Sequence, residues 1–270
     1  MADHEAYNNY RIEAPADFSE LFSHFYFASN NSGEPITRTL LPSFQTIMVF
    51  SFGAPISLTT SQNDELELDK CLVAGPIKQA FSYTLSAGAE MLVANFKGDA
   101  FFRFFGTASV AEHLHPDDLL NENCFTLLWT ELKAIQGVNN RVNHILEFCR
   151  PYKQPGHPIT EQIVALSDSG ISPVKEISQK ENLSERAIQM NLKKRLGYSS
   201  REMGRYTRFL KAIQLVRQIA SGPGEMDWFE VIEQCGYYDQ SQLIHDFKHY
   251  LNLSPSKYLK FHQGICSSRG

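Results

Sequence analysis

The sequence predicts an α+β protein of two domains: a β-rich N-terminal domain with a helical connector, and an all-α C-terminal domain with two helix-turn-helix units. Two observations support this prediction. Short β-branched and aromatic runs between Gly, Pro, Ser and Asn fill much of the N-terminal half, whereas apolar residues with a helical period fill the C-terminal half. A length of 270 residues with 43% hydrophobic content is enough for one core in each domain.

The segment 1–150 is expected to form the β-rich domain and its connector. Residues 1–35 have a loosely structured start followed by an aromatic, amphipathic segment at 18–27. The polar and acidic stretch 53–70 is interpreted as an exposed loop. The predicted strands are 36–41, 45–52, 71–75, 80–86 and 91–96.

Helices are predicted to complete this domain. Residues 99–105 are expected to form a short helix that closes the β unit, and the helical connector occupies about 119–150. The apolar face of its first helix, 121–136, suits pairing across a two-fold axis and packing on its own β unit equally well. The segment PYKQPGHP at 151–158 is interpreted as a linker to a second domain at 159–270.

The segment 227–258 predicts a helix, a tight turn and a second helix. Gly236 ends the first helix, and Asp239 is the expected N-cap of the second. The second helix has a polar outer face, as expected of a recognition helix that enters the major groove of DNA. Its candidate DNA contacts are Gln240, Ser241, Gln242, His245 and Lys248.

A similar pattern precedes it at 173–196, with a break at Asn182 and an N-cap at Ser184. Gln and Arg side chains can bond adenine and guanine edges, and lysines suit phosphates, so Arg186 and Gln189 are the favoured base-reading residues. The complete outer face comprises Glu185, Arg186, Gln189, Met190, Lys193 and Lys194.

A long helix is predicted between the two units at 200–220. At 1.5 Å per residue it would span about 30 Å, close to the roughly 34 Å between successive major-groove faces of B-DNA. One chain can therefore fill two adjacent grooves. The expected phosphate contacts are Lys193, Lys194, Arg195, Arg201 and Arg205.

The charge is divided unevenly along the chain. The net charge is −5, with −8 in residues 1–155 and +3 from residue 156 onward. Residues 173–217 carry +7, whereas 225–258 carry −4. Because phosphate neutralisation supplies most of the affinity in non-specific DNA binding, the first unit and the long helix are expected to hold DNA, and the second unit to contribute weakly.

Composition argues against several other classes of protein. No run approaches 18 apolar residues and the N-terminus lacks the pattern of a signal peptide, which predicts a cytoplasmic protein without membrane contact. The cysteines are five in number and scattered, so reduced thiols are favoured over disulfides or a zinc site. No catalytic signature motif occurs, so an enzyme is not expected.

Two further features are candidate ligand sites. His113 and His115 are two residues apart, so on a strand of a cupin-like barrel both could face the same metal ion. Because Pro116 follows them, a surface loop is the favoured interpretation of this segment. Aromatic residues of the strands can line an apolar pocket for a small effector or can simply form the core of the sheets.

Residues 173–259 resemble the DNA-binding domain of AraC/XylS-type transcription regulators. The resemblance rests on Leu183-Ser184-Glu185-Arg186, Gly236-Tyr237, Asp239-Gln240-Ser241 and Leu253-Ser254-Pro255-Ser256-Lys257-Tyr258. The N-terminal domain also resembles, less specifically, the β-rich, cupin-like sensor domain that precedes such domains. The resemblance implies a sequence-specific DNA-binding regulator, either an activator or a repressor. Its implied partners are double-stranded DNA and, as further candidates, RNA polymerase, a small-molecule effector and a second copy of the chain.

The chain also departs from the family pattern. Met190 and His245 stand where arginines are usual, and Leu259 and Ser200 replace a frequent arginine and proline. Together with the acidic second unit, these departures motivate an alternative to the DNA-binding regulator. This alternative is a protein-interaction module that keeps the fold without binding DNA. A metal-dependent cupin enzyme is a third, weaker alternative. No cofactor is implied.

Overall fold

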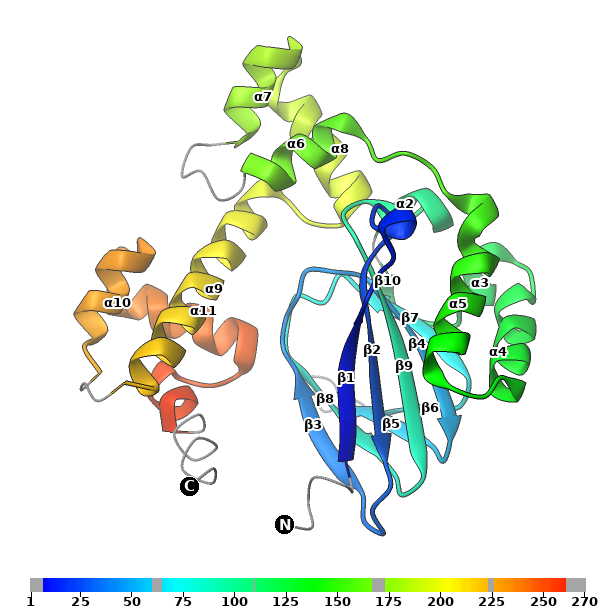
Figure 1. Ribbon diagram of the computed structural model, residues 1–270. Coiled ribbons are helices and arrows are strands. Elements are labelled where there is room, and N and C mark those ends of the chain that lie inside the picture. Colours follow the sequence, from blue (N-terminus) through cyan, green and yellow to red (C-terminus); the bar gives the residue numbers. More distant parts are fainter. Residues whose placement is uncertain (1–6, 60–64, 109, 167–172, 223–225, 261–270) are drawn as a thin grey trace.

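A computed structural model describes residues 7–59, 65–108, 110–166, 173–222 and 226–260. The strands gather in one part of the molecule and the helices α6 to α11 in another, while α3, α4 and α5 flank the strands (Figure 1). The predicted fold class, α+β with a β-rich cupin-like domain and an all-α domain, is confirmed.

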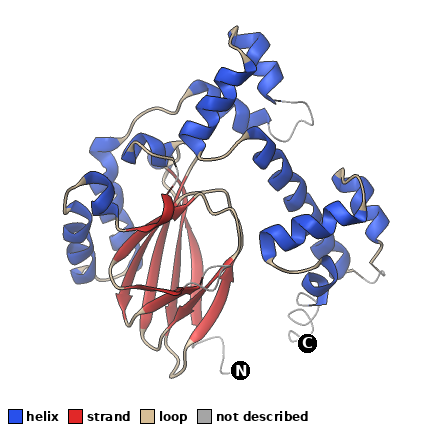
Figure 2. Cartoon of the chain, turned by 180° about the vertical axis from the view of Figure 1, so that it is seen from behind, coloured by secondary structure: helices blue, strands red, loops and turns tan. Residues whose placement is uncertain are grey.

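Two sheets face each other in the N-terminal domain, seen from behind in Figure 2. The six-stranded sheet has the order β1-β2-β9-β4-β7-β10, and the four-stranded sheet has the order β3-β8-β5-β6. The paired strands whose registers are given are antiparallel. The strands are β1 (Tyr7–Glu13), β2 (Phe22–Asn30), β3 (Ile36–Leu40), β4 (Ile47–Gly53), β5 (Ile56–Thr59), β6 (Glu65–Leu68), β7 (Cys71–Gly75), β8 (Phe81–Leu85), β9 (Ala89–Phe96) and β10 (Val110–Leu114).

The apolar run in β4 is explained by burial of this strand on both faces. Successive side chains of a strand point to opposite faces of the sheet. Ile47 and Val49 accordingly pack between the two sheets, whereas Met48, Phe50 and Phe52 pack on the other side against the helices. The six-stranded sheet therefore separates two hydrophobic cores.

Helices cover the outer face of the six-stranded sheet. The core there joins strand residues to Phe125, Leu128 and Leu132 of α4 and to Val142 and Ile145 of α5. The connector helix α4 thus uses its apolar face within its own domain. The helical elements of this part are η1 (Ala16–Phe18), α2 (Ala100–Phe105), α3 (Pro116–Leu120), α4 (Cys124–Ala134), α5 (Val138–Cys149) and η2 (Arg150–Tyr152).

Four segments of this domain differ from the sequence-based expectation. The N-terminal residues 7–13 form β1 rather than a loose segment, and most of the aromatic segment 18–27 belongs to strand β2. The expected loop 53–70 contains the antiparallel strands β5 and β6. The histidine-containing segment forms β10, paired with β7, instead of a surface loop.

The C-terminal domain contains both predicted helix-turn-helix units. Ser184 accepts a hydrogen bond from the Ala187 N–H, and Asp239 accepts one from the Gln242 N–H, so both predicted N-caps are confirmed. Gly236 ends α10 with φ of 74°. The helices are α6 (Pro158–Leu166), α7 (Pro173–Glu181), α8 (Glu185–Leu196), α9 (Ser200–Ala220), α10 (Trp228–Cys235) and α11 (Gln240–Leu251). The end of the expected helix at 167–169 lies outside the described residues.

The long helix α9 joins the two units. It has 21 residues, and it begins with a capping box in which Ser199 and Glu202 satisfy each other's backbone N–H groups. Phe209, Ala212, Ile213 and Val216 place its apolar face in the core of the domain. This face fixes α9 as the support on which α10 and α11 pack.

Two glycines of this domain make an informative pair for stability. Gly204 lies within α9, and a Cβ added there meets no atom within 4 Å. Gly197 has φ of 74°, and an added Cβ would lie 2.8 Å from the Ala108 carbonyl oxygen. Gly204→Ala should stabilise the protein by about 0.5–1 kcal/mol through helix propensity, whereas Gly197→Ala should destabilise it by about 1–2 kcal/mol. Urea unfolding of both variants measures this contrast, and a loss of stability in Gly204→Ala would contradict it.

Candidate nucleic-acid interface and sensor cavity

The recognition helix of the first unit, α8, presents most of its predicted DNA-contacting residues to solvent. Ile188, Leu192 and Leu196 are buried and hold the opposite face against the domain core. Met190 is 64% exposed, so its side chain is accessible to a thymine methyl group. The other exposed residues on this face are Glu185, Arg186, Gln189, Lys193 and Lys194.

The last turn of α8 lies against the N-terminal domain. Arg195, a predicted phosphate contact, is 3.4 Å from the buried carboxylate of Asp99, which also binds Arg103 at 2.9 Å. Its guanidinium lies 5.1 Å from the ring centre of Phe102 in α2. Arg195 therefore connects the first unit to the N-terminal domain in this structure, and Figure 1 shows the end of α8 beside α2.

The start of α9 contributes two more predicted phosphate contacts. Arg201 is exposed, but Arg205 turns toward α11, where its Nε lies 2.6 Å from Asp246 Oδ1. Arg208 binds the other carboxylate oxygen of Asp246 at 3.1 Å. The Asp246 side chain is only 2% exposed, so this pair of arginines compensates a buried negative charge.

The second recognition helix, α11, uses part of its polar face within the domain. Gln242 accepts a hydrogen bond from the Tyr238 N–H and so helps to cap the helix. The His245 Nδ1 lies 2.9 Å from an Arg205 nitrogen, although the side chain itself is exposed. Gln240, Ser241 and Lys248 are exposed.

Two aromatic side chains of the second unit were missed by sequence reasoning. Tyr238, in the turn before α11, is 91% exposed, and Phe229 of α10 is 79% exposed. The apolar periodicity that predicts buried positions excluded Phe229 from the core. Tyr238 directly precedes the predicted N-cap Asp239, and a side chain at this position can reach a phosphate beside the recognition helix. This position is the sequence feature that could have identified Tyr238.

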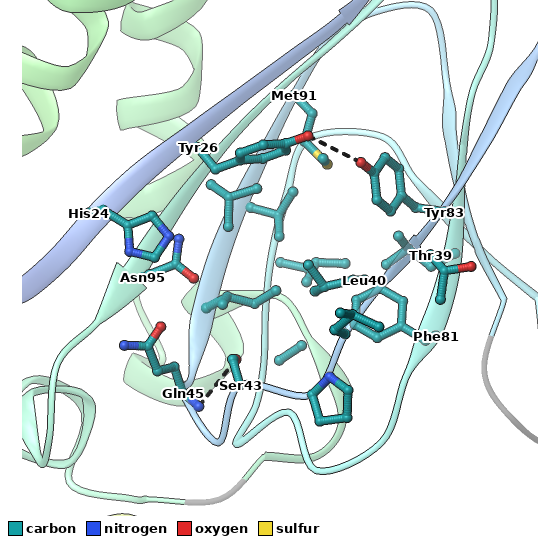
Figure 3. A pocket seen from close by; sticks show the side chains of 18 residues that line it. His24, Tyr26, Thr39, Leu40, Ser43, Gln45, Phe81, Tyr83, Met91 and Asn95 are labelled. Atoms are coloured by element: carbon teal, nitrogen blue, oxygen red, sulfur yellow. Dashed lines mark hydrogen bonds between the residues drawn. The ribbon is translucent and has the colours of Figure 1, made fainter. Parts of the chain in front are cut away.

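A cavity of about 420 Å³ lies between the two sheets of the N-terminal domain (Figure 3). Ile47, Val49 and Val93 form an apolar wall, and two groups of polar side chains interrupt it. His24, Gln45 and Asn95 lie on one side, and Tyr26 and Tyr83 on another (Figure 3). The sequence predicts that the aromatic strands either line a pocket or form a plain core. Both are present, because the strands that line the cavity also contribute side chains to the core between the sheets.

The titrating groups of this cavity favour their uncharged forms. Burial, together with the nearby Arg11, lowers the pKa of His24 below its usual value. Burial also raises the pKa values of Tyr26 and Tyr83, whose hydroxyl groups form a hydrogen-bonded set with Tyr7 at 3.0–3.5 Å. At neutral pH these groups offer hydrogen bonds but no charge.

A second hollow contains a cysteine, a histidine and an aspartate. Cys71 Sγ lies 3.2 Å from His115 Nε2, and His115 Nδ1 lies 3.5 Å from an Asp117 oxygen. Burial raises the pKa of Cys71 to about 12, so the thiol stays protonated and is a poor nucleophile. Asp117 accepts hydrogen bonds from the start of α4, which gives it a structural role. Among the residues that the structure describes, no group of three or more His, Cys, Asp or Glu is arranged to hold a metal.

The loop before β4 carries a side chain that enters the C-terminal domain. Phe44 stacks on Tyr206 of α9 with ring centres 4.3 Å apart, and its edge meets Tyr198 at 5.0 Å. The Tyr206 hydroxyl donates to the Pro42 carbonyl at 2.7 Å. Phe44 is 8% exposed and belongs to the core of the C-terminal domain.

Two other contacts join the domains nearby. The Ala80 N–H donates to the Tyr250 carbonyl of α11 at 2.8 Å, and Lys78 binds Glu202 at 2.7 Å. Burial raises the pKa of Glu202, but hydrogen bonds from Lys78 and Ser199 outweigh this effect and lower it to about 2. The carboxylate of Glu202 therefore stays ionised over the physiological pH range.

Two segments of the chain match models of known domain families. Residues 177–260 match the family model of a helix-turn-helix domain, and residues 10–115 match that of a domain of unknown function, DUF6597. No curated protein sequence matches the chain.

Several solved structures are similar to this chain. ToxT from Vibrio cholerae O395 matches over 96% of this chain and 99% of its own, with 15% identity and a TM-score of 0.43. A ToxT structure with bound unsaturated fatty acid matches over 94% of each chain, also with 15% identity and a TM-score of 0.43. The C-terminal domain of AraT, a response regulator from Geobacillus stearothermophilus, matches over 39% of this chain and 86% of its own, with 23% identity and a TM-score of 0.31.

Two helix-turn-helix units joined by one long helix, behind a β-rich domain, define a DNA-binding protein with a separate N-terminal module. The match of residues 177–260 to a helix-turn-helix domain agrees with the motifs of both units. The chain is a DNA-binding transcription regulator whose residues 177–260 form a domain of the helix-turn-helix family. Within the described part of the chain, no helix has both the length and the apolar character needed to cross a membrane.

Proposed function

We propose that the protein binds a two-part DNA site mainly through its first helix-turn-helix unit and the start of α9. The observation that carries this proposal is the exposed basic face of α8 with Arg186, Lys193 and Lys194, although the Lys194 Nζ also lies 5.9 Å from the ring centre of Phe102. Arg186 and Gln189 would read bases, and Lys193, Lys194 and Arg201 would hold phosphates.

The second unit would add sequence specificity, but it would contribute less to the affinity for DNA than the first unit. Its exposed face offers Gln240, Ser241, His245 and Lys248 to a neighbouring groove. Arg205 is bound to the buried Asp246 and would support α11 instead of a phosphate. Arg195 would reach a phosphate only after leaving Asp99.

We also propose that the N-terminal domain binds a small effector in the cavity between its sheets. The cavity is large enough for a small organic molecule, since ligand sites commonly occupy about 300–1,000 Å³. The predicted boundaries of the domains, 1–150 and 159–270 with a linker at 151–158, belong to this proposal. A cytoplasmic location, contact with RNA polymerase and a homodimer remain predictions from the sequence.

The experiment that tests DNA binding selects from a random duplex library with purified full-length protein at two salt concentrations. We expect an enriched motif with two boxes about one helical turn apart, the first box being the stronger. The matched control is the double variant Lys193→Ala and Lys194→Ala, which should lower the retention of DNA. It should also reduce the slope of log affinity against log salt concentration by the amount expected for about two phosphate contacts.

The outcomes of this selection separate the candidate functions. A single enriched box would show that only the basic first unit reads sequence. Weak retention that vanishes with added salt, without any enriched motif, would contradict specific binding by the chain alone. That result would favour the protein-interaction module, for which the exposed Phe229 and Tyr238 are the specific observation.

A further inference from the structure

The cavity between the sheets has a wall without charged side chains. Among the described residues that line it, none is Asp, Glu, Lys or Arg. A ligand that carries a permanent charge would lose its hydration there without gaining a counter-ion, which is strongly unfavourable. Apolar side chains make most of the wall, and hydroxyl, amide and imidazole groups supply hydrogen bonds at its two polar sides (Figure 3).

One segment lies between this cavity and the C-terminal domain. Leu41, Pro42, Ser43 and Gln45 all line the cavity, whereas Phe44 of the same segment packs between Tyr198 and Tyr206 of the other domain. Phe44 has φ of 55°, a left-handed conformation that turns its side chain away from the cavity and that a bulky residue rarely adopts. A shift of the cavity wall would therefore move the ring that contacts α9.

The segment is held firmly enough to transmit such a shift. The N–H groups of Ser43 and Phe44 both donate to the Ile77 carbonyl, at 3.1 and 3.0 Å, and the Ile77 N–H donates to Gln45. Phe81, four residues after Ile77, lines the cavity as well, and the preceding Ala80 N–H bonds the last turns of α11 through the Tyr250 carbonyl. Both cavity-lining segments thus contact helices of the DNA-binding domain.

We propose that the cavity binds an uncharged, mainly apolar molecule with one or more hydrogen-bonding groups, and that the segment Leu41–Gln45 transmits its occupancy to α9 and α11 through Phe44. This inference rests on the proposed function, because the readout is DNA affinity. Two ligands that bind one protein alter each other's affinity by the same factor, commonly 5- to 150-fold.

The ligand class is tested with two fluorescent probes that share a ring system. N-phenyl-1-naphthylamine is uncharged, and 1-anilinonaphthalene-8-sulfonate carries a sulfonate. In a titration of the full-length protein, we expect saturable binding of the uncharged probe at one site and at least tenfold weaker binding of the sulfonate. Ala74→Phe, which puts a ring into the cavity, should abolish binding of the uncharged probe while the thermal unfolding transition is retained. Equal binding of both probes, or no binding of the uncharged one, would overturn the assignment.

The transmission is tested by DNA affinity with and without the uncharged probe. We expect saturating probe to change the dissociation constant of the selected duplex at least fivefold in the wild-type protein. In Phe44→Ala this change should fall below twofold, although the probe still binds because Phe44 is not part of the cavity wall. Lys78→Ala is the control, since it breaks another contact between the domains without altering the wall, and it should keep the response.

Each failure has a separate meaning. A wild-type protein that binds DNA and the probe, but whose DNA affinity does not change, would overturn transmission and leave DNA binding intact. The same holds if Phe44→Ala responds as strongly as the wild type. DNA binding without any probe is measured in the same titrations, so a failure of the proposed function is recognised independently.

Discussion

Arg186→Ala is expected to weaken specific DNA binding about 10- to 100-fold, whereas His245→Ala should weaken it no more than about threefold. A bidentate contact from an arginine to guanine contributes about 1–3 kcal/mol of discrimination, and 1.4 kcal/mol corresponds to a factor of ten. Arg186 is exposed in the first turn of α8. It takes part in none of the ion pairs formed between described residues, so no acidic side chain among them competes with DNA for it. The His245 ring nitrogen already meets Arg205.

The measurement is a titration of the selected duplex and of a scrambled duplex at one salt concentration. Arg186→Ala should lower affinity for the selected duplex more than for the scrambled one, since a base contact affects only the specific complex. Arg11→Ala is the matched control, because it removes the same charge from an exposed pair with Glu13 in the N-terminal domain, and it should change neither affinity. Equal losses in the Arg186 and His245 variants would refute the unequal roles of the two units.

Asp246→Ala is expected to destabilise the C-terminal domain by roughly 3 kcal/mol. Removal of one partner from a buried ion pair leaves the other charge uncompensated and typically costs about 3–5 kcal/mol. The Asp246 side chain is 2% exposed, while Arg205 and Arg208 are 29% and 25% exposed, so water relieves part of the cost. The value should therefore lie at the lower end of this range.

Chemical denaturation of the full-length protein measures this loss. The transition of the C-terminal domain should shift to lower denaturant, and the transition of the β-rich domain should shift less. Glu233→Ala provides the control because Glu233 is an exposed acid on α10, and such surface changes are usually within about 0.5 kcal/mol. A loss below 1 kcal/mol for Asp246→Ala would mean that the two arginines find water or other partners at little cost.

The helix-turn-helix units were predictable because their signals are local. Caps at Ser184 and Asp239 and the glycine at 236 act on backbone groups within one helical turn. Strand β4 was also predicted, since burial on both faces leaves a continuous apolar run. The strands β1 and β5 were missed, because each lies in a polar stretch of sequence and is stabilised by hydrogen bonds to its partner strands, β2 for β1 and β6 and β8 for β5.

The candidate DNA-binding face was predicted more completely than the cavity of the N-terminal domain. Helical periodicity alone places Arg186, Gln189 and Lys193 on the outer face of α8, and the structure leaves all three exposed. Periodicity did not distinguish Arg201, which is exposed, from Arg205, which is bound to Asp246. That distinction depends on an acid 41 positions away in the sequence.

A β-rich domain followed by two capped helical units with a basic first face could be predicted from the order of residues, because caps, periodicity and charge are properties of neighbouring residues. Three features appear only in the folded chain: which arginines lack an acidic partner among the described residues, the cavity without charged side chains between the sheets, and the stacking of Phe44 on Tyr206 of α9. These features require segments far apart in the chain to meet, and the energy of their contacts depends on burial that only the folded molecule creates.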